Sequence, residues 1–499
     1  MNRKTGVVLS YIYMVFEVLS TLLLTPYIIR TLGQAEFGVY KLAGSINAYL
    51  LLLDLGMGNA IIRYVSKYRA TGDMVSQKKF LGVATLYYLG IAAVTVIIGL
   101  ILIAIFPSAF SKGLTESEIQ LGQKLLSITM LNSAVTLGTA AYNNVLIAYE
   151  RYTVSKGYAI VQIIFRIILT YLALKAGMGS IGIVSVNLLM TALCRSFFVG
   201  YVLKVLKLRP QFRNINLGFV KGIVAYSSLI LLQMLATQIN NTVDQILLGL
   251  LVPSSATIIA VYGVGSQIVT YFQSIGTSFT GVLMPGVVRL VESGGTSQQL
   301  GDEMVRTGRI IFMALGVIWG CFLLYGKQFV ILWAGAENSE AYSITAILIT
   351  AHLLLITQTT GTQVLWAKNA HKEQAILKIT IVLANVLLTI LLIKWKPLMG
   401  ATIGTFVSLM LGDVLAMNIV FKKKIGISFK EYYAHLLKGI LPCLLMLIGS
   451  GLFIIRISIS GWEGLVLKVA MSCVIYAACL WLFGMNRYEK RLVLSLIKR

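Results

Sequence analysis

Ionisable residues are scarce in this chain. Only 12% of its 499 residues are Asp, Glu, Lys or Arg, whereas 58% are hydrophobic. Soluble globular proteins are about 25% charged and about 45–50% apolar, so this composition cannot cover a surface that faces water. The lack of charge therefore excludes a soluble fold and predicts an all-α integral membrane protein.

Cysteine and histidine are also rare, at 5 and 3 residues. The cysteines all fall inside apolar stretches without ligand spacing, which indicates packing rather than a disulfide or metal framework. His352 lies inside an apolar run, where packing is the commoner role and a proton relay is the alternative. No G-x-x-x-x-G-K-[ST], G-x-S-x-G or H-E-x-x-H motif occurs. We therefore expect no metal, no cofactor and no enzyme activity.

Long apolar runs fill the chain from end to end. A helix that crosses a bilayer needs about 20 apolar residues, and about fourteen runs reach that length. The linkers between them hardly exceed about 20 residues, which leaves no room for a soluble catalytic domain. The predicted spans cover residues 7–29, 38–61, 80–106, 122–148, 154–175, 180–203, 218–250, 257–288, 308–333, 342–367, 375–394, 398–421, 434–456 and 462–484.

Basic residues are distributed unevenly between alternate linkers. With the N-terminus inside, the inner linkers hold roughly three times as many Lys and Arg residues as the outer ones. Lys156 and Lys378 count among the inner bases, and Arg30 among the outer ones. The imbalance predicts that both termini are cytoplasmic. Cytoplasmic loops and an anionic lipid surface then account for the net charge of +24, without nucleic acid.

An internal repeat indicates two similar halves. Residues 145–174 align without a gap with residues 364–393, a shift of about 220 residues or six spans. An even number of spans keeps both copies in one orientation, as in transporters with two parallel lobes; chance similarity between apolar helices is the alternative. We expect an N-terminal lobe at 1–210, a C-terminal lobe at 211–425, two further spans at 426–485 and an amphipathic cytoplasmic tail at 486–499.

Polar residues recur inside the predicted spans at helical spacing. Gln162 and Arg166 are four residues apart, and Asn187 and Arg195 are eight apart, so each pair lies on one helical face. A charge at the bilayer centre costs roughly 2.5–3.5 kcal/mol, and such groups therefore face a cavity or a partner. One polar face on each of several helices predicts a bundle around a water-filled interior. Interhelical hydrogen bonds without a lumen are the alternative.

The candidate site residues separate by charge. Basic groups in the first lobe suit an anionic head group such as a pyrophosphate, because the arginine fork pairs with its oxygens. For Arg166 and Arg195, an ion pair with Glu17 or Asp54, or snorkelling, is the alternative. Asp413 lies near the inner end of its span and is expected to be structural. Asp54 also lies near the inner end of its span, and a structural role is the alternative to ion binding there. The expected head-group ligands are Arg166, Arg195, Lys41, Arg30, Glu17, Gln162, Asn187, Asn240 and Gln267. The expected ligands of a coupling ion are Asp244, Glu17 and Asp54.

Two stretches near the N-terminus resemble a known family. They are TPYIIRTLGQAEFGVYKLAGSI (25–46), with the pattern P-x-I-x-R-x-L-G…F-G-x-Y, and LDLGMGNAIIRYVSKYRATGD (53–73), with D-x-G…R. Both resemble the opening of polysaccharide and oligosaccharide-lipid flippases, the Wzx-type, RfbX-like branch of the multidrug/oligosaccharidyl-lipid/polysaccharide exporter superfamily. Two six-span lobes followed by two extra spans also look like that branch.

The resemblance implies the transport of a lipid-linked oligosaccharide. The expected cargo is an undecaprenyl-diphosphate-linked oligosaccharide or a related teichoic-acid precursor. It would cross the bacterial plasma membrane by alternating access, driven by a gradient of H+ or Na+. Basic lumen residues recur in that family, and Arg166 and Arg195 fit that role here. Membrane lipids and other proteins of envelope polysaccharide assembly are the expected partners.

Three alternatives remain open. A lipid II flippase differs only in its substrate. A multidrug/cation antiporter belongs to the same superfamily, but a cationic drug would suit acidic lumen residues. A membrane glycan polymerase or ligase, from another class, would need a large external loop with catalytic groups, and the longest outer linker, near 107–121, is short.

Overall fold

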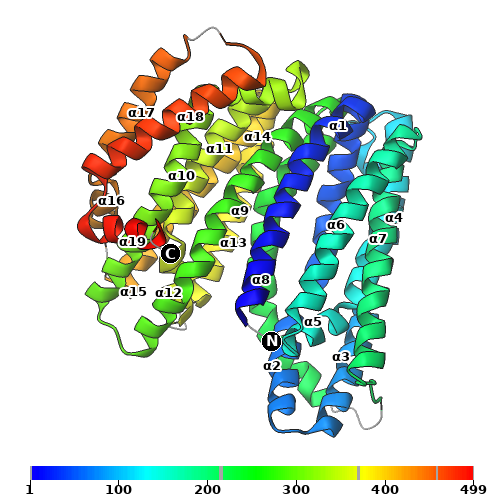
Figure 1. Cartoon of the computed structure of the whole chain (residues 1–499). Helices are drawn as coiled ribbons and strands as arrows, with labels where there is room; N and C mark the ends of the chain where they lie inside the picture. The colour runs from blue at the N-terminus through cyan, green and yellow to red at the C-terminus, as the bar shows by residue number, and fades with distance from the viewer. Residues whose placement is uncertain are drawn as a thin grey trace. The chain divides into compact units, whose positions relative to one another are not determined.

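The computed structural model describes residues 3–54, 56–212, 217–367, 371–426, 428–456 and 459–497. Over these residues the fold is all-helical and has no strand, as the composition predicts (Figure 1). The helices group into two compact units, Met1–Ala260 and Val261–Arg499. This division follows contacts between helices, so the limits of the two lobes and the six-span repeat stay predictions.

Long helices make up the first unit. α1 packs against α4 and α6, α6 packs against α7, and α7 packs against α4, so these four helices form a closed ring. In Figure 1, α6 and α7 run side by side. The elements are α1 (Arg3–Leu51), η1 (Leu52–Asp54), α2 (Met57–Ala70), α3 (Met74–Phe110), α4 (Glu116–Gly138), α5 (Ala140–Ala148), α6 (Tyr152–Lys175), α7 (Gly179–Gly200), η2 (Tyr201–Val205), α8 (Leu217–Leu251) and the beginning of α9 (Ala256–Glu292).

α1 is too long to be one membrane crossing. At about 1.5 Å per residue, its 49 residues would extend about 74 Å, more than twice the hydrocarbon thickness of about 30 Å. Gly33 interrupts the helix with φ 75° and ψ 172°, a conformation that glycine adopts because it has no Cβ. The predicted spans 7–29 and 38–61 lie on either side of this break. The second span ends early, since η1 and a left-handed Gly56 separate it from α2.

Shorter and more broken helices make up the second unit. Within it, α10 packs against α11, α13 against α14, and α17 against α18. Its elements, after the rest of α9, are α10 (Ser297–Ala334), η3 (Ala336–Asn338), α11 (Ala341–Thr357), α12 (Thr359–Ala367), α13 (His371–Ile393), α14 (Pro397–Ser408), η4 (Leu409–Ala416), α15 (Met417–Lys424), α16 (Phe429–Leu437), α17 (Ile440–Ile454), α18 (Gly461–Cys479), η5 (Leu480–Gly484) and α19 (Arg487–Ile497).

The helical surface is suited to a membrane. Among the described residues, 9 helical stretches are long and apolar enough to cross a bilayer, or up to 12 if each of three bent pairs is one span. This count does not confirm the predicted fourteen, and it takes Ile12–Ala70 as one stretch despite the break at Gly33. Large apolar side chains such as Leu23 and Phe483 are exposed; they would be unfavourable in water and suit hydrocarbon. The chain is a multi-pass membrane protein.

The turn between α2 and α3 is defined by a helix cap. The Asp73 carboxylate accepts a hydrogen bond from the Ser76 backbone N–H at 2.9 Å, which satisfies a free donor at the N-terminus of α3. Hydrogen bonds from Ser76 hold the pKa of the Asp73 carboxyl below its usual range. The predicted topology places this turn on the cytoplasmic side.

The C-terminal helix α19 is joined to α10 by a buried ion pair. Arg309 Nε and Nη2 donate to the two carboxylate oxygens of Glu489 at 2.7 and 3.2 Å. Arg309 also donates to the carbonyl oxygens of Lys438 and Gly484 at 2.7 and 2.9 Å. The guanidinium is well satisfied, so burial of the pair does not leave an unpaired charge. The predicted tail is therefore helical over Arg487–Ile497, and its position on the lipid surface stays a prediction.

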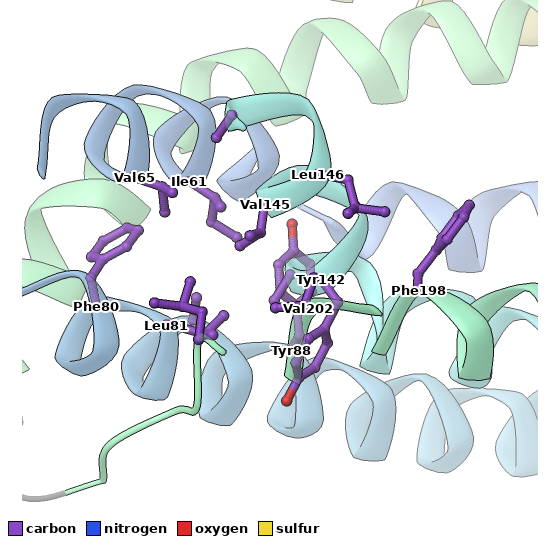
Figure 2. Close-up of a cluster of buried hydrophobic side chains, with 14 of the residues drawn as sticks. Ile61, Val65, Phe80, Leu81, Tyr88, Tyr142, Val145, Leu146, Phe198 and Val202 are labelled. Atoms are coloured by element: carbon purple, nitrogen blue, oxygen red, sulfur yellow. The ribbon is translucent and has the colours of Figure 1, made fainter. Parts of the chain in front are cut away.

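A cluster of buried apolar side chains joins α2, α3, α5 and α7 in the first unit (Figure 2). Ile61 of α2, Leu81 of α3, Val145 of α5 and Phe198 of α7 all belong to it. Removal of so many contacts would leave a cavity, and truncation of a buried Phe to Ala typically costs about 3–5 kcal/mol. The cluster therefore fixes the ends of these four helices relative to one another.

Candidate functional site

A polar cavity lies inside the first unit, among α1, α4, α5, α6 and α7. Its volume is about 250 Å³. A water molecule takes up about 30 Å³ of liquid, so the cavity has room for several waters or for a phosphate-sized group. The four helices of the closed ring all contribute to its wall. The lining residues are Tyr13, Thr136, Asn143, Ile147, Ser155, Lys156, Ala159, Gln162, Thr191, Cys194, Arg195 and Phe198.

Helical periodicity explains how α6 and α7 contribute to the wall. Ser155, Ala159 and Gln162 occupy positions i, i+4 and i+7 of α6, which lie on one face. Thr191 and Arg195 are four residues apart on α7 and share a face in the same way. Gln162 and Arg195, both expected ligands, therefore line one cavity, whereas Arg166 and Asn187, predicted on the same faces, are not among its lining residues. The water-filled interior and the role of these residues stay predictions.

The apolar cluster supports the cavity from behind. Cys194 and Phe198 belong both to that cluster and to the lining of the cavity. Both side chains are buried. The position of the Arg195 side chain is therefore coupled to the packing of α7 against α2, α3 and α5.

The cavity carries positive charge. Lys156 and Arg195 line it, whereas none of the described lining residues is an Asp or Glu. Lys156 Nζ lies 4.8 Å from the centre of the Tyr13 ring, a cation–π contact. Two like charges in a partly desolvated space are unfavourable unless an anion joins them. Hydroxyl and amide groups of Thr191, Gln162 and other lining residues can complete the hydrogen bonding of such an anion.

Arg166 lies one helical turn beyond Gln162 and is paired. Its Nη2 donates to Glu17 Oε1 at 3.1 Å, and the two side chains are 28% and 37% exposed. Of the alternatives left open by the sequence, the ion pair with Glu17 is the one observed. A half-exposed pair of this kind contributes about 0–1 kcal/mol. The charge of Arg166 is thus largely compensated, which leaves Arg195 and Lys156 as the bases that define the cavity.

The other residues expected near the N-terminal half take separate positions. Arg30 is exposed. Lys41 Nζ lies 5.2 Å from the centre of the Phe37 ring. Asp54 accepts a hydrogen bond from the Tyr88 hydroxyl at 2.6 Å. In the part of the chain that the structure describes, these groups are not part of the cavity wall.

The remaining expected ligands are spread over further helices. Asn187 lies on α7, two turns before Arg195 and outside the lining set. Asn240 and Asp244 lie on α8, where Asp244 is buried. Gln267 belongs to the second unit and donates from Nε2 to the Tyr271 hydroxyl at 2.5 Å. The three residues expected to bind a coupling ion therefore lie on separate elements, namely Asp244 on α8, Glu17 on α1 and Asp54 on η1.

Lys156 is a cavity residue that the sequence did not reveal. A lysine near a span end is expected to reach toward water, and Lys156 lies near the inner end of the predicted span 154–175 and counts among the inner bases. In the structure α6 begins at Tyr152, so Lys156 lies in the helix and lines the cavity. Lys156 is three residues before Ala159, which shares a face with Ser155 and Gln162, and this i, i+3 spacing is the signal that could have placed Lys156 beside the cavity.

The described residues show neither a metal-binding cluster nor a disulfide bond. They contain no group of three or more His, Cys, Asp or Glu side chains that could hold a metal ion. All five cysteines are free and at least partly buried, which agrees with the predicted packing role.

Solved structures with a similar fold are membrane transporters. A lipid II flippase, MurJ, in an inward closed conformation is similar to this chain, with a TM-score of 0.71 and 15% identity. The similarity covers 95% of this chain and 97% of that structure's chain. An inward-facing multidrug resistance MATE family transporter of the MOP superfamily is similar over 82% of this chain and 94% of its own chain, at 16% identity and a TM-score of 0.63. The MATE transporter VcmN of Vibrio cholerae is similar over 86% of this chain and 98% of its own chain, at 14% identity and a TM-score of 0.58.

The sequence itself matches one family. No curated protein matches the chain. Residues 4–291 match the family described as "Polysaccharide biosynthesis protein". The match extends over more than half of the chain and includes every residue that lines the cavity. The chain therefore belongs to the polysaccharide biosynthesis protein family, and it has the transporter fold shared by MurJ and the MATE proteins.

Proposed function

We propose that this protein is a flippase that moves a lipid-linked oligosaccharide of the undecaprenyl-diphosphate type, or a teichoic-acid precursor, across the bacterial plasma membrane. The observation that carries the proposal is the cationic cavity of the first unit. Arg195 and Lys156 line it together with amide and hydroxyl groups, and its described lining has no carboxylate. A diphosphate needs compensating cations and many hydrogen-bond donors, and guanidinium and ammonium groups provide both.

The physical separation of head group and tail makes the transport feasible. The isoprenoid tail remains in hydrocarbon, while the charged head group crosses through the polar interior. Alternating access then exposes the cavity first to the cytoplasmic face and later to the outer face, with both termini in the cytoplasm. A gradient of H+ or Na+ supplies the energy, since the chain has no nucleotide-binding motif.

The charge of the cavity disfavours a multidrug/cation antiporter. A cationic drug would meet Arg195 and Lys156 at close range, and like charges in a desolvated space repel each other. A lipid II flippase fits the cavity equally well, because lipid II also carries a diphosphate. A glycan polymerase or ligase is disfavoured, because only Ser111–Thr115 separate α3 from α4 in the linker expected to be the longest outer one.

Reconstituted protein provides the test. Proteoliposomes would carry a short undecaprenyl-diphosphate oligosaccharide, and periodate added outside would oxidise the sugars in the outer leaflet. Oxidation beyond the fraction seen in protein-free vesicles then measures the sugars that have crossed. We expect flipping that depends on protein, that fails for Arg195→Gln and that persists for Arg30→Gln, an exposed arginine outside the cavity. Transport of cationic dyes without transport of lipid diphosphates would contradict the proposal. A comparison with lipid II in the same vesicles distinguishes the two anionic cargoes.

A further inference from the structure

A second polar region lies in the second unit, between α13 and α14. Asn385 and Thr389 of α13 are fully buried. Asn385 Oδ1 accepts hydrogen bonds from the hydroxyls of Thr389 and Thr405, both at 3.2 Å. Lys378 lies seven residues before Asn385, two turns away on the same face of α13. The interface between these helices is therefore a polar seam inside the membrane-spanning part of the protein.

An ion pair continues this seam. Lys378 Nζ lies 3.2 Å from Asp413 Oδ1, and the side chains are 22% and 5% exposed. Asp413 belongs to η4, a π-helical segment; such segments are rare and often occur at functional sites. The neighbouring Gly412 permits the close approach, because a Cβ there would lie 2.1 Å from Ile381 Cγ1 of α13. Lys378 lies near the inner end of the predicted span 375–394 and counts among the inner bases, and its pairing with Asp413 shows that it reaches into the bundle instead of toward water.

A buried histidine completes the group. His352 of α11 is 8% exposed, and α11 packs against both α14 and η4. His352 Nδ1 lies 2.8 Å from the Leu348 carbonyl oxygen. A carbonyl oxygen can only accept, so Nδ1 carries the hydrogen and Nε2 is the nitrogen that can take a further proton. The charges of Asp413 and Lys378 both act on this ring.

The other titratable groups near α11 are engaged elsewhere. On α10, the Tyr325 hydroxyl is bonded to Ser472 of α18 at 2.8 Å, and Cys321 interacts with Cys473 of α18. On α9, the Tyr271 hydroxyl accepts from Gln267. α12 and α14 have no charged residue in their sequences. Asp413 and Lys378 are the charged side chains that act electrostatically on His352 among the described residues.

We propose that His352, Lys378 and Asp413 form a proton-binding site in the second unit. In the unprotonated state the carboxylate of Asp413 pairs with Lys378 through Oδ1. When Nε2 of His352 takes a proton from water, the ring becomes an imidazolium, and two cations then compete for one carboxylate. This competition weakens the link between α13 and η4, two elements whose close contact depends on Gly412.

The site provides a way to couple transport to a proton gradient. As a coupling site it rests on the proposed transport function, whereas its binding of protons does not. Lys378 already supplies the cation next to Asp413, so the site has no need of Na+. Charged residues inside membrane segments are costly and commonly belong to ion or proton pathways.

Nuclear magnetic resonance can read the proton directly. The chain has three histidines, so the protein labelled with 15N-histidine in nanodiscs gives few ring signals, and His352→Gln identifies the one in question. We expect this Nε2 signal to change from the unprotonated to the protonated form as the pH falls from about 8 into the acidic range. The control His435→Gln should leave the change intact. A His352 signal that stays the same across this range would overturn the proposal.

Electron paramagnetic resonance can read the link between the helices. Nitroxides at Leu383 of α13 and Leu411 of η4 occupy exposed positions and need not disturb the seam. Their dipolar broadening should differ between pH 8 and pH 5, and the difference should be lost in His352→Gln and in Asp413→Asn. In the protein that keeps His352, Lys378 and Asp413, an identical spectrum at the two pH values would refute the mechanism. A pH-dependent difference that appears only with Na+ would refute it as well. Neither experiment uses cargo, so a failed flipping assay and a failed proton site are distinguishable.

Discussion

Arg195→Gln should weaken the binding of a lipid diphosphate much more than Arg166→Gln does. Both changes remove an arginine from neighbouring helices and leave an amide donor. Arg195 lines a cavity whose described wall has no carboxylate, whereas the charge of Arg166 is already compensated by Glu17 at 3.1 Å. The comparison therefore tests whether the uncompensated charge, rather than the mere presence of an arginine, holds the head group.

The expected magnitudes follow from the two environments. A hydrogen bond to a charged group contributes about 1.5–3 kcal/mol, and each 1.4 kcal/mol corresponds to about a tenfold change in Kd. Arg195→Gln should therefore raise the Kd about 10- to 150-fold. Arg166 is outside the described lining and its charge is compensated by Glu17, so Arg166→Gln should raise the Kd less than about fivefold, which corresponds to about 1 kcal/mol. Arg195→Lys, which keeps the charge and loses the fork, should lie between them.

Binding of undecaprenyl diphosphate to protein in nanodiscs, followed by a fluorescence titration at constant ionic strength, gives the Kd values. Thermal unfolding in the same nanodiscs shows whether each variant remains folded. An equal loss in the two glutamine variants, or a larger loss for Arg166→Gln, would refute the assignment of the cavity as the head-group site. An unchanged Kd for Arg195→Gln would do the same.

Three further changes test other contacts. Glu17→Gln removes the carboxylate that compensates Arg166, so diphosphate binding should tighten severalfold. Weaker diphosphate binding in the same titration would contradict the idea that Glu17 compensates Arg166. Phe198→Ala removes a buried ring behind the cavity and should cost about 3–5 kcal/mol, seen as a lower Tm; the exposed neighbour Phe197 provides the control Phe197→Ala, which should change Tm far less. Glu489→Ala leaves the buried Arg309 without its carboxylate, at a cost of about 3–5 kcal/mol, and should speed the limited proteolysis of α19; an unchanged rate would show that other contacts hold this helix.

Helical faces were predictable because they depend only on spacing along the chain. Gln162, Thr191 and Arg195 occupy polar faces that the sequence shows, and the structure turns all three into one cavity. The choice of partner was not predictable. Arg166 and Glu17 are 149 residues apart, and periodicity shows the face of a helix without showing which helix lies opposite.

Span ends were the weakest part of the sequence interpretation. Lys156 and Lys378 both lie near the ends of predicted spans, where a lysine is expected to reach water. In the structure one lines the cavity and the other pairs with Asp413. A long, flexible side chain can extend in either direction along its helix, so its destination depends on whether neighbouring helices offer a polar partner.

The sequence by itself determined that this chain is an all-helical membrane protein with polar faces turned inward, because hydrophobic length and helical period are local properties. The tertiary structure alone decided that Glu17 compensates Arg166, that Arg195 and Lys156 remain as the bases of the cavity, and that Lys378 lies against Asp413. These outcomes depend on distances between helices far apart in the chain. An ion pair needs its groups within a few ångströms of each other, and the fold, not the sequence order, sets that distance.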